Sequence, residues 1–163
     1  MSPTGYVIAE VFRDGVLMQR SENHNIITSQ GDSYIADQLS LVPVRSKFGG
    51  VNAFIAVGTG WTGISPKTNT WVNTLVGIPT PVSAGYPQLQ ATWGNTGSNV
   101  LVTIGTYPVG ALNATGITEA ALVTTPSLGP TTSCFAYAQL IPPATVTSSD
   151  TFLLTWVITF LGS

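Results

Sequence analysis

Few side chains in this sequence can do chemistry. His24 is the single histidine and Cys134 the single cysteine. A structural zinc site needs about four Cys or His ligands, so these two residues do not predict one. His24 could be combined with Asp32 and a serine as a hydrolytic triad, but the chain has no GxSxG nucleophile motif. We predict no catalytic residues, no metal site and no cofactor, and we interpret Cys134 as a small core side chain.

Glu119 and Asp150 are the only acids after Lys67. Glycoside hydrolysis uses two carboxyl groups about 5–10 Å apart, and nothing in the sequence predicts that these two lie close together. Glu119 interrupts the apolar run ITEAALV, so an inward-pointing carboxylate there must be paired or hydrogen-bonded. We predict a structural role for Glu119, with catalysis as the alternative.

Two glycines follow a predicted strand in the motif Gly58-Thr59-Gly60. A dinucleotide-binding fingerprint needs a third glycine and an immediate helix, whereas Trp61 and a proline-containing segment follow here. Lys67 also lacks the GK[ST] context of a phosphate-binding loop. We therefore interpret the motif as a glycine turn that ends a strand.

Four tryptophans could stack on sugars or on nucleic-acid bases. We predict no nucleic-acid partner, because no basic residues stand beside the tryptophans and the net charge is −2. Trp61 and Trp71 lie in loop-like sequence and are predicted to be exposed aromatics that could bind a glycan. Core packing is the alternative for both, as for Trp93 and Trp156.

The charge content is low and unevenly distributed. Only 7% of the 163 residues are charged, against about 25% in an average soluble domain. Ten of the twelve charged residues lie at or before Lys67. The uncharged second half indicates either a surface covered by other protein chains or a surface made polar by Ser and Thr.

Targeting signals are not evident in the sequence. The most apolar stretch, residues 152–161, is half the length of a membrane-spanning helix and is interrupted by threonines, so it predicts a strand. The first residues, MSPTG, contain no basic segment followed by an apolar core. We expect synthesis in the cytoplasm and no membrane partner.

The secondary structure is predicted to be mostly β, because β-branched and aromatic runs alternate with Gly, Pro, Asn and Ser turns. An amino-terminal hairpin is expected over about residues 5–20, with Asp14-Gly15 in its turn. Further strands are predicted at residues 53–57, 88–93, 100–106, 117–124, 134–141 and 151–161. Residues 1–163 are predicted to form one all-β, antiparallel domain resembling a β-sandwich or jelly roll.

One short helix is predicted over about residues 32–41, with Asp32 as its N-cap and Pro43 ending it. Asp37 is expected on its solvated face. The last strand is apolar on both faces, which predicts that Trp156 is buried, either at the centre of the domain or against a neighbouring subunit.

The order of several motifs resembles small virion structural proteins of tailed bacteriophages. These motifs are NIIT at residues 25–28, Gly31 with the short helix, FIAVGTG at 54–60, ITEAAL at 117–122, FAYA at 135–138 and LTWVITF at 154–160. The segment VGIP at residues 76–79 departs from the pattern, which has an acid there. We assign structural roles to Asn25, Gly31, Gly58, Gly60, Glu119 and Trp156.

The resemblance implies a β fold without catalytic residues that assembles as a trimer. It implies a capsid decoration, or cement, protein that binds the major capsid protein on the virion surface and is not an enzyme. Two alternatives stay open. One is a tail, baseplate or fibre component that binds a receptor or glycan, and the other is a glycan depolymerase.

Overall fold

The computed structural model describes residues 4–63, 67–89 and 99–160, which form nine strands, one α-helix and one turn of 3₁₀ helix. In chain order these are β1 (Thr4–Arg13), β2 (Val16–Ile27), α1 (Ser29–Gln38), the 3₁₀ turn (Gly50–Asn52), β3 (Phe54–Gly58), β4 (Leu75–Pro81), β5 (Gln88–Leu89), β6 (Val100–Tyr107), β7 (Ala114–Val123), β8 (Cys134–Val146) and β9 (Asp150–Thr159). The prediction of an all-β protein with one short helix is confirmed.

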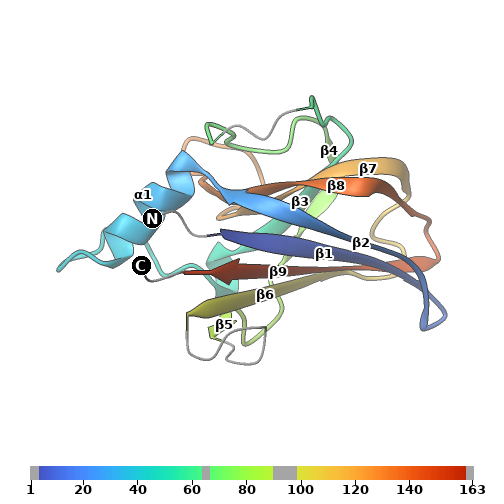
Figure 1. The fold of residues 1–163 in the computed structure, drawn as a ribbon, viewed down its shortest axis with the longest axis horizontal. Helices are drawn as coiled ribbons and strands as arrows, with labels where there is room; N and C mark the ends of the chain where they lie inside the picture. The colour runs from blue at the N-terminus through green and yellow to red at the C-terminus, as the bar shows by residue number, and fades with distance from the viewer. Residues whose placement is uncertain (1–3, 64–66, 90–98, 161–163) are drawn as a thin grey trace.

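All strands belong to one antiparallel sheet in the order β4-β3-β7-β8-β2-β1-β9-β6-β5. The sheet curls into a half-barrel (Figure 1), so that the chain at the end of β4 reaches β6 near the opposite edge. There, Val82 forms a bridge with Gly105, and Ser83 N donates to Ile104 O at 2.7 Å. The strands therefore form one curled sheet, whereas the prediction of a β-sandwich implied two sheets packed face to face.

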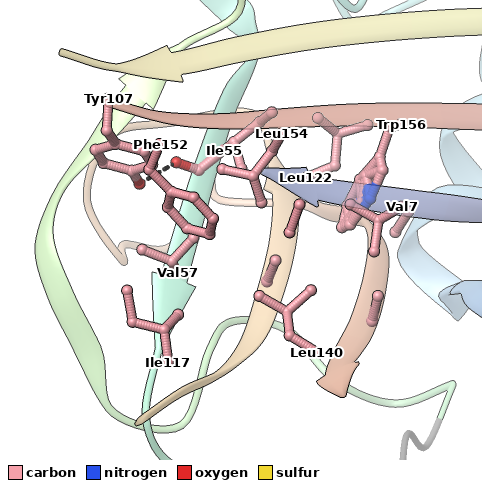
Figure 2. Close-up of a cluster of buried hydrophobic side chains, with 14 of the residues drawn as sticks. Val7, Ile55, Val57, Tyr107, Ile117, Leu122, Leu140, Phe152, Leu154 and Trp156 are labelled. Atoms are coloured by element: carbon pink, nitrogen blue, oxygen red, sulfur yellow. Dashed lines mark hydrogen bonds between the residues drawn. The ribbon is translucent and has the colours of Figure 1, made fainter. Parts of the chain in front are cut away.

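The inner face of the curled sheet holds the main core. Phe152, Leu154 and Trp156 of β9 are fully buried there together with side chains from β1, β3, β7 and β8. Tyr107 of β6 spans this core and donates its hydroxyl to Ile55 O in β3 at 2.6 Å (Figure 2). The burial of Trp156 is confirmed, and its strand lies centrally between β1 and β6.

Part of the outer face is buried as well. Alternate residues of β3, β7 and β8 that point away from the main core include Ala56, Ala121 and Tyr137, and all three are fully buried. The segment between β3 and β4 covers them, with Trp61, Trp71 and Val72 packed on this second cluster. A strand covered on both faces becomes apolar throughout, which explains the continuous apolar sequence of β7.

The amino-terminal hairpin is confirmed and is longer than predicted. Asp14 and Gly15 adopt positive φ values of 51° and 78° in its turn, as a tight hairpin requires. β4 was not predicted, because its Gly and Pro content is typical of a loop. The strand predicted at 88–93 is only two residues long in β5, and residues 90–93, including Trp93, lie outside the described residues.

The predicted helix bounds and its N-cap are wrong. The helix begins three residues earlier, because Thr28 is the N-cap and its hydroxyl accepts from Gly31 N at 3.0 Å. Asp32 instead forms an ion pair with Lys67 at 2.6 Å. The helix ends at Gln38, because the Asp37 carboxylate binds the backbone amides of Val44 and Arg45 and thereby holds the following chain in a turn.

β8 continues through Pro142 and Pro143, which have no backbone N–H to donate. Side-chain amides of β2 supply the missing connections. Asn23 bonds both the carbonyl and the amide of Ile141, at 3.3 and 3.1 Å, and Gln19 donates to Pro143 O at 2.8 Å. The predicted end of this strand at residue 141 is therefore too early.

An ion pair closes the end of the sheet at the turn between β8 and β9. Arg13 Nε donates to Asp150 Oδ1 at 2.8 Å, and the backbone amide and hydroxyl of Thr147 both donate to Oδ2 at 2.8 Å. The hydrogen bond from Arg13 and the amide of Thr147 hold the pKa of the Asp150 carboxyl well below its ordinary value. This cluster joins the β1–β2 hairpin to the start of β9.

The Asp150 cluster predicts a specific acid sensitivity. Because the folded-state pKa is depressed, its stabilisation is complete above the unfolded pKa of about 3.9 and is lost as pH falls through the folded value. Asp150→Asn should lower the melting temperature at pH 7 and flatten its decline below pH 4. Thermal unfolding from pH 7 to pH 2 measures this, with Asp14→Asn as the control in an exposed turn. Parallel pH profiles for Asp150→Asn and the wild type would contradict it.

Candidate functional site

Five of the residues selected from sequence converge on the outer face of β3 and β7. Gly58 ends β3, Gly60 and Trp61 follow it, Trp71 lies in the covering segment, and Glu119 points outward from β7 beneath that segment. Gly58 and Glu119 are directly paired across the two strands. This is the one place where the predicted polar and aromatic candidates meet, and we call it the Glu119 site.

The carboxylate of Glu119 is fully buried and accepts five hydrogen bonds. Oε1 accepts from three backbone amides, those of Gly60 at 2.9 Å, Asn73 at 3.0 Å and Thr74 at 3.2 Å. Oε2 accepts from Asn73 Nδ2 at 3.1 Å and from the hydroxyl of Tyr137. Both ends of the segment that connects β3 to β4 are thus tied to one carboxylate.

Tyr137 and Asn73 complete the site, and the sequence analysis did not identify either. Tyr137 lies in β8 across from Ala121, and its ring stacks on Trp61 with centroids 6.0 Å apart. Burial, reinforced by its hydrogen bond to Glu119, raises the pKa of the Tyr137 hydroxyl, so it remains a neutral donor. The only sequence signal was a hydroxyl-bearing side chain within the apolar run FAYA at residues 135–138.

The two glycines are required by close approach rather than by turn geometry. A Cβ on Gly58 would lie 2.5 Å from Thr74 O and 2.6 Å from Glu119 Oε1. A Cβ on Gly60 would lie 2.6 Å from Thr74 Oγ1 and 2.8 Å from Asn73 Cβ. Side chains at either position would separate the backbone amides from the carboxylate, so the GTG motif serves the Glu119 site.

The hydrogen bonds of Glu119 hold the backbone of the segment between β3 and β4. They also occupy both carboxylate oxygens, so neither is free to accept a proton from a substrate. A general acid or base must reach the proton that it transfers, whereas this carboxylate is enclosed and saturated by donors from the protein itself. In the described part of the chain, no group of three or more His, Cys, Asp or Glu side chains could hold a metal ion. The chemistry available at this site is the anchoring of a surface segment.

Trp61 and Trp71 are partly buried against the second core cluster, so the prediction of freely exposed rings is corrected. They pack there because the outer face of β3, β7 and β8 is apolar and needs a cover. Trp71 also lines an open pocket of about 430 Å³, whose other lining residues include Asn69, Thr70 and Asn73. The pocket is polar and has an aromatic ring on one side.

The other selected residues lie elsewhere. Gly31 brings the first turn of α1 against the backbone of Phe135 in β8, where a Cβ would collide with the carbonyl oxygen. Asn25 is buried in β2 opposite Gly5, and its amide makes no hydrogen bond within the described residues. His24 is exposed on β2. Burial raises the pKa of the Cys134 thiol to about 12, which disfavours its reactive thiolate at neutral pH.

Comparison with known proteins gives no assignment. No family model matches the chain, and no curated protein or solved structure matches it significantly. In the described residues, no helix has both the length and the apolar character needed to cross a membrane.

Proposed function

We propose that this chain is a non-enzymatic structural protein of a tailed-phage virion, one that decorates the capsid by binding the major capsid protein and further copies of itself. The resemblance in motif order motivates the choice of virion. The structural observation that carries an interface role is the absence of exposed side-chain charge from the second half of the chain.

Only Glu119 and Asp150 are charged after Lys67, and both are withdrawn from the surface. Glu119 is fully buried, and Asp150 is 2% exposed and paired with Arg13. Charged side chains are costly to cover with another protein, because they must be desolvated. A surface without them favours contact with neighbouring subunits over a broad area.

The buried carboxylates of Glu119 and Asp150 also hold two surface segments in a fixed conformation before any partner binds. Glu119 holds the segment between β3 and β4, and Asp150 holds the turn between β8 and β9. Loops that are already ordered lose little conformational entropy when a partner binds. A protein of this kind would bridge capsid subunits by burying about 1,000 Å² or more per contact, which makes rupture of the shell more costly.

A tail or fibre component that binds a glycan is the second candidate. The pocket beside Trp71 favours it, because an aromatic face with nearby Asn and Thr side chains can hold a sugar ring without charge.

Copy number per particle distinguishes the two. Quantitative mass spectrometry of purified virions should find hundreds of copies relative to the major capsid protein. Particles that lack the chain should assemble but release DNA at a lower temperature, and adding the purified chain back should restore the release temperature. A few copies per particle would favour the tail component, and absence from virions would contradict both.

A further inference from the structure

The segment after α1 presents an unusual group of aliphatic side chains to solvent. Leu39, Leu41, Val42 and Val44 are 82%, 99%, 76% and 87% exposed. We call residues 39–44 the apolar loop. At about 100 Å² per side chain, it presents on the order of 400 Å² of apolar surface. The largest apolar patch on a typical monomer is about 300–600 Å² and is often functional.

Hydrogen bonds at both ends hold the apolar loop in a defined conformation. The Asp37 carboxylate accepts from Val44 N at 3.1 Å and from Arg45 N at 3.0 Å, and Gln38 Nε2 donates to Arg45 O at 3.0 Å. The hydroxyl of Tyr34 donates to Ser46 O. In Figure 1 the segment projects beyond α1 at the left end of the molecule. These bonds hold Leu41 away from its own chain.

An apolar pocket of about 310 Å³ lies beside the loop. Its walls include Phe48 and Phe135, whose rings stack with centroids 4.9 Å apart, together with Leu101 and Phe160. Its lining also includes the amide side chain of Gln38 and the charged side chain of Lys47. We call it the α1 pocket. Its volume is at the lower end for small-molecule sites, roughly 300–1,000 Å³, and suits one or two aliphatic side chains.

We propose that the apolar loop of one copy of this chain inserts Leu41 into the α1 pocket of a second copy. Leu39 belongs to both features, since it begins the loop and lines the pocket. The apolar loop and the α1 pocket therefore lie side by side on the same chain, and the loop does not fill the pocket of its own chain. Two copies that approach through this end can satisfy both at once, as self-complementary contacts do.

A second copy fits better than a charged partner or a small anion. The loop itself has no charged side chain between Leu39 and Val44, and the pocket contributes only the single cation of Lys47. The loop and the pocket are both apolar. A contact between them removes apolar surface of both from water, on the order of twice the apolar area of the loop alone. The inference rests on the self-association included in the proposed function.

The first test is the mass of the purified chain by light scattering over a wide concentration range. The wild type should assemble to a multiple of 17.0 kDa, and Leu41→Glu should remain at 17.0 kDa. Val16→Glu is the matched control, because Val16 is 61% exposed, lies outside the loop and pocket, and precedes the uncharged second half of the chain. It should assemble like the wild type. A wild type that stays monomeric, or a Leu41→Glu variant that assembles normally, overturns the proposal.

The second test asks whether the two features meet across copies. Leu41→Cys and Lys47→Cys chains with tags of different length are mixed under mild oxidation. Cys134 does not compete, because it is fully buried. The mixed disulfide should exceed both self-linked dimers, whereas no excess over random pairing overturns the interface. Capsid binding is measured in parallel to separate the two proposals. A wild type that is monomeric but binds capsids would overturn the interface between copies and leave the proposed function standing. A Leu41→Glu variant that is monomeric and still binds capsids would show that the interface between copies is separate from capsid binding.

Discussion

Glu119→Ala should lower the free energy of unfolding by about 3–5 kcal/mol, because five neutral donors lose their shared acceptor and each unpaired donor costs about 1 kcal/mol or more. The donors are three partly buried backbone amides, Asn73 Nδ2 and the buried hydroxyl of Tyr137. For a chain of this length, such a loss corresponds to a decrease in melting temperature of about 10 °C. Thermal unfolding by circular dichroism measures it.

Glu119→Gln provides a graded comparison. It retains one carbonyl oxygen for the backbone amides but places an amide NH₂ opposite Asn73 Nδ2, so a loss of about 1–3 kcal/mol is expected. Glu22→Gln is the matched control. Glu22 is 47% exposed and pairs with Arg20, so its removal should change stability by less than about 1 kcal/mol. A Glu119→Ala melting temperature equal to that of Glu22→Gln would contradict the anchoring role.

Trp156→Ala should cost about 3–5 kcal/mol, as is usual for the truncation of a fully buried aromatic side chain. Trp156 is fully buried and lies near Val7 in the main core (Figure 2). Its strand β9 is an interior strand, in which Trp156 is paired with Val7 of β1 on one side and with Thr103 of β6 on the other. No neighbouring strand can move inward to fill the cavity without breaking its own pairing. Urea unfolding, with the m-value monitored for a change in cooperativity, measures the loss.

Trp156→Phe should be much milder. Its Nε1–H donates no hydrogen bond within the described residues, so the substitution removes an unpartnered polar group together with part of the ring. The two effects oppose each other, and a cost of about 1 kcal/mol is expected. Trp71→Ala is the comparison for a partly buried ring and should cost less than Trp156→Ala. Equal costs for Trp71→Ala and Trp156→Ala would contradict the central position of Trp156 in the core.

The sequence predicted the hairpin turn and most of the strands, whereas the bounds and the N-cap of the helix were wrong. Asp14-Gly15 predicted the hairpin turn because few residues adopt positive φ. β3, β6, β7 and β9 were predicted because β-branched and aromatic runs between turn residues favour strands. β4 and the Pro142-Pro143 part of β8 were missed. Partners distant in sequence supply their hydrogen bonds, and local preference for a loop is overridden.

The order of residues along the chain was enough to determine that this is a β-rich protein with little charge in its second half, and that the carboxylate of Glu119, within an apolar run, needs partners. Only the tertiary structure decided which partners these are. The donors come from residues 60, 73, 74 and 137, and a carboxylate gathers them only when the sheet curls and the covering segment closes over β7. It also placed the apolar loop beside the α1 pocket, because the pocket is assembled from α1 and from strands distant in sequence.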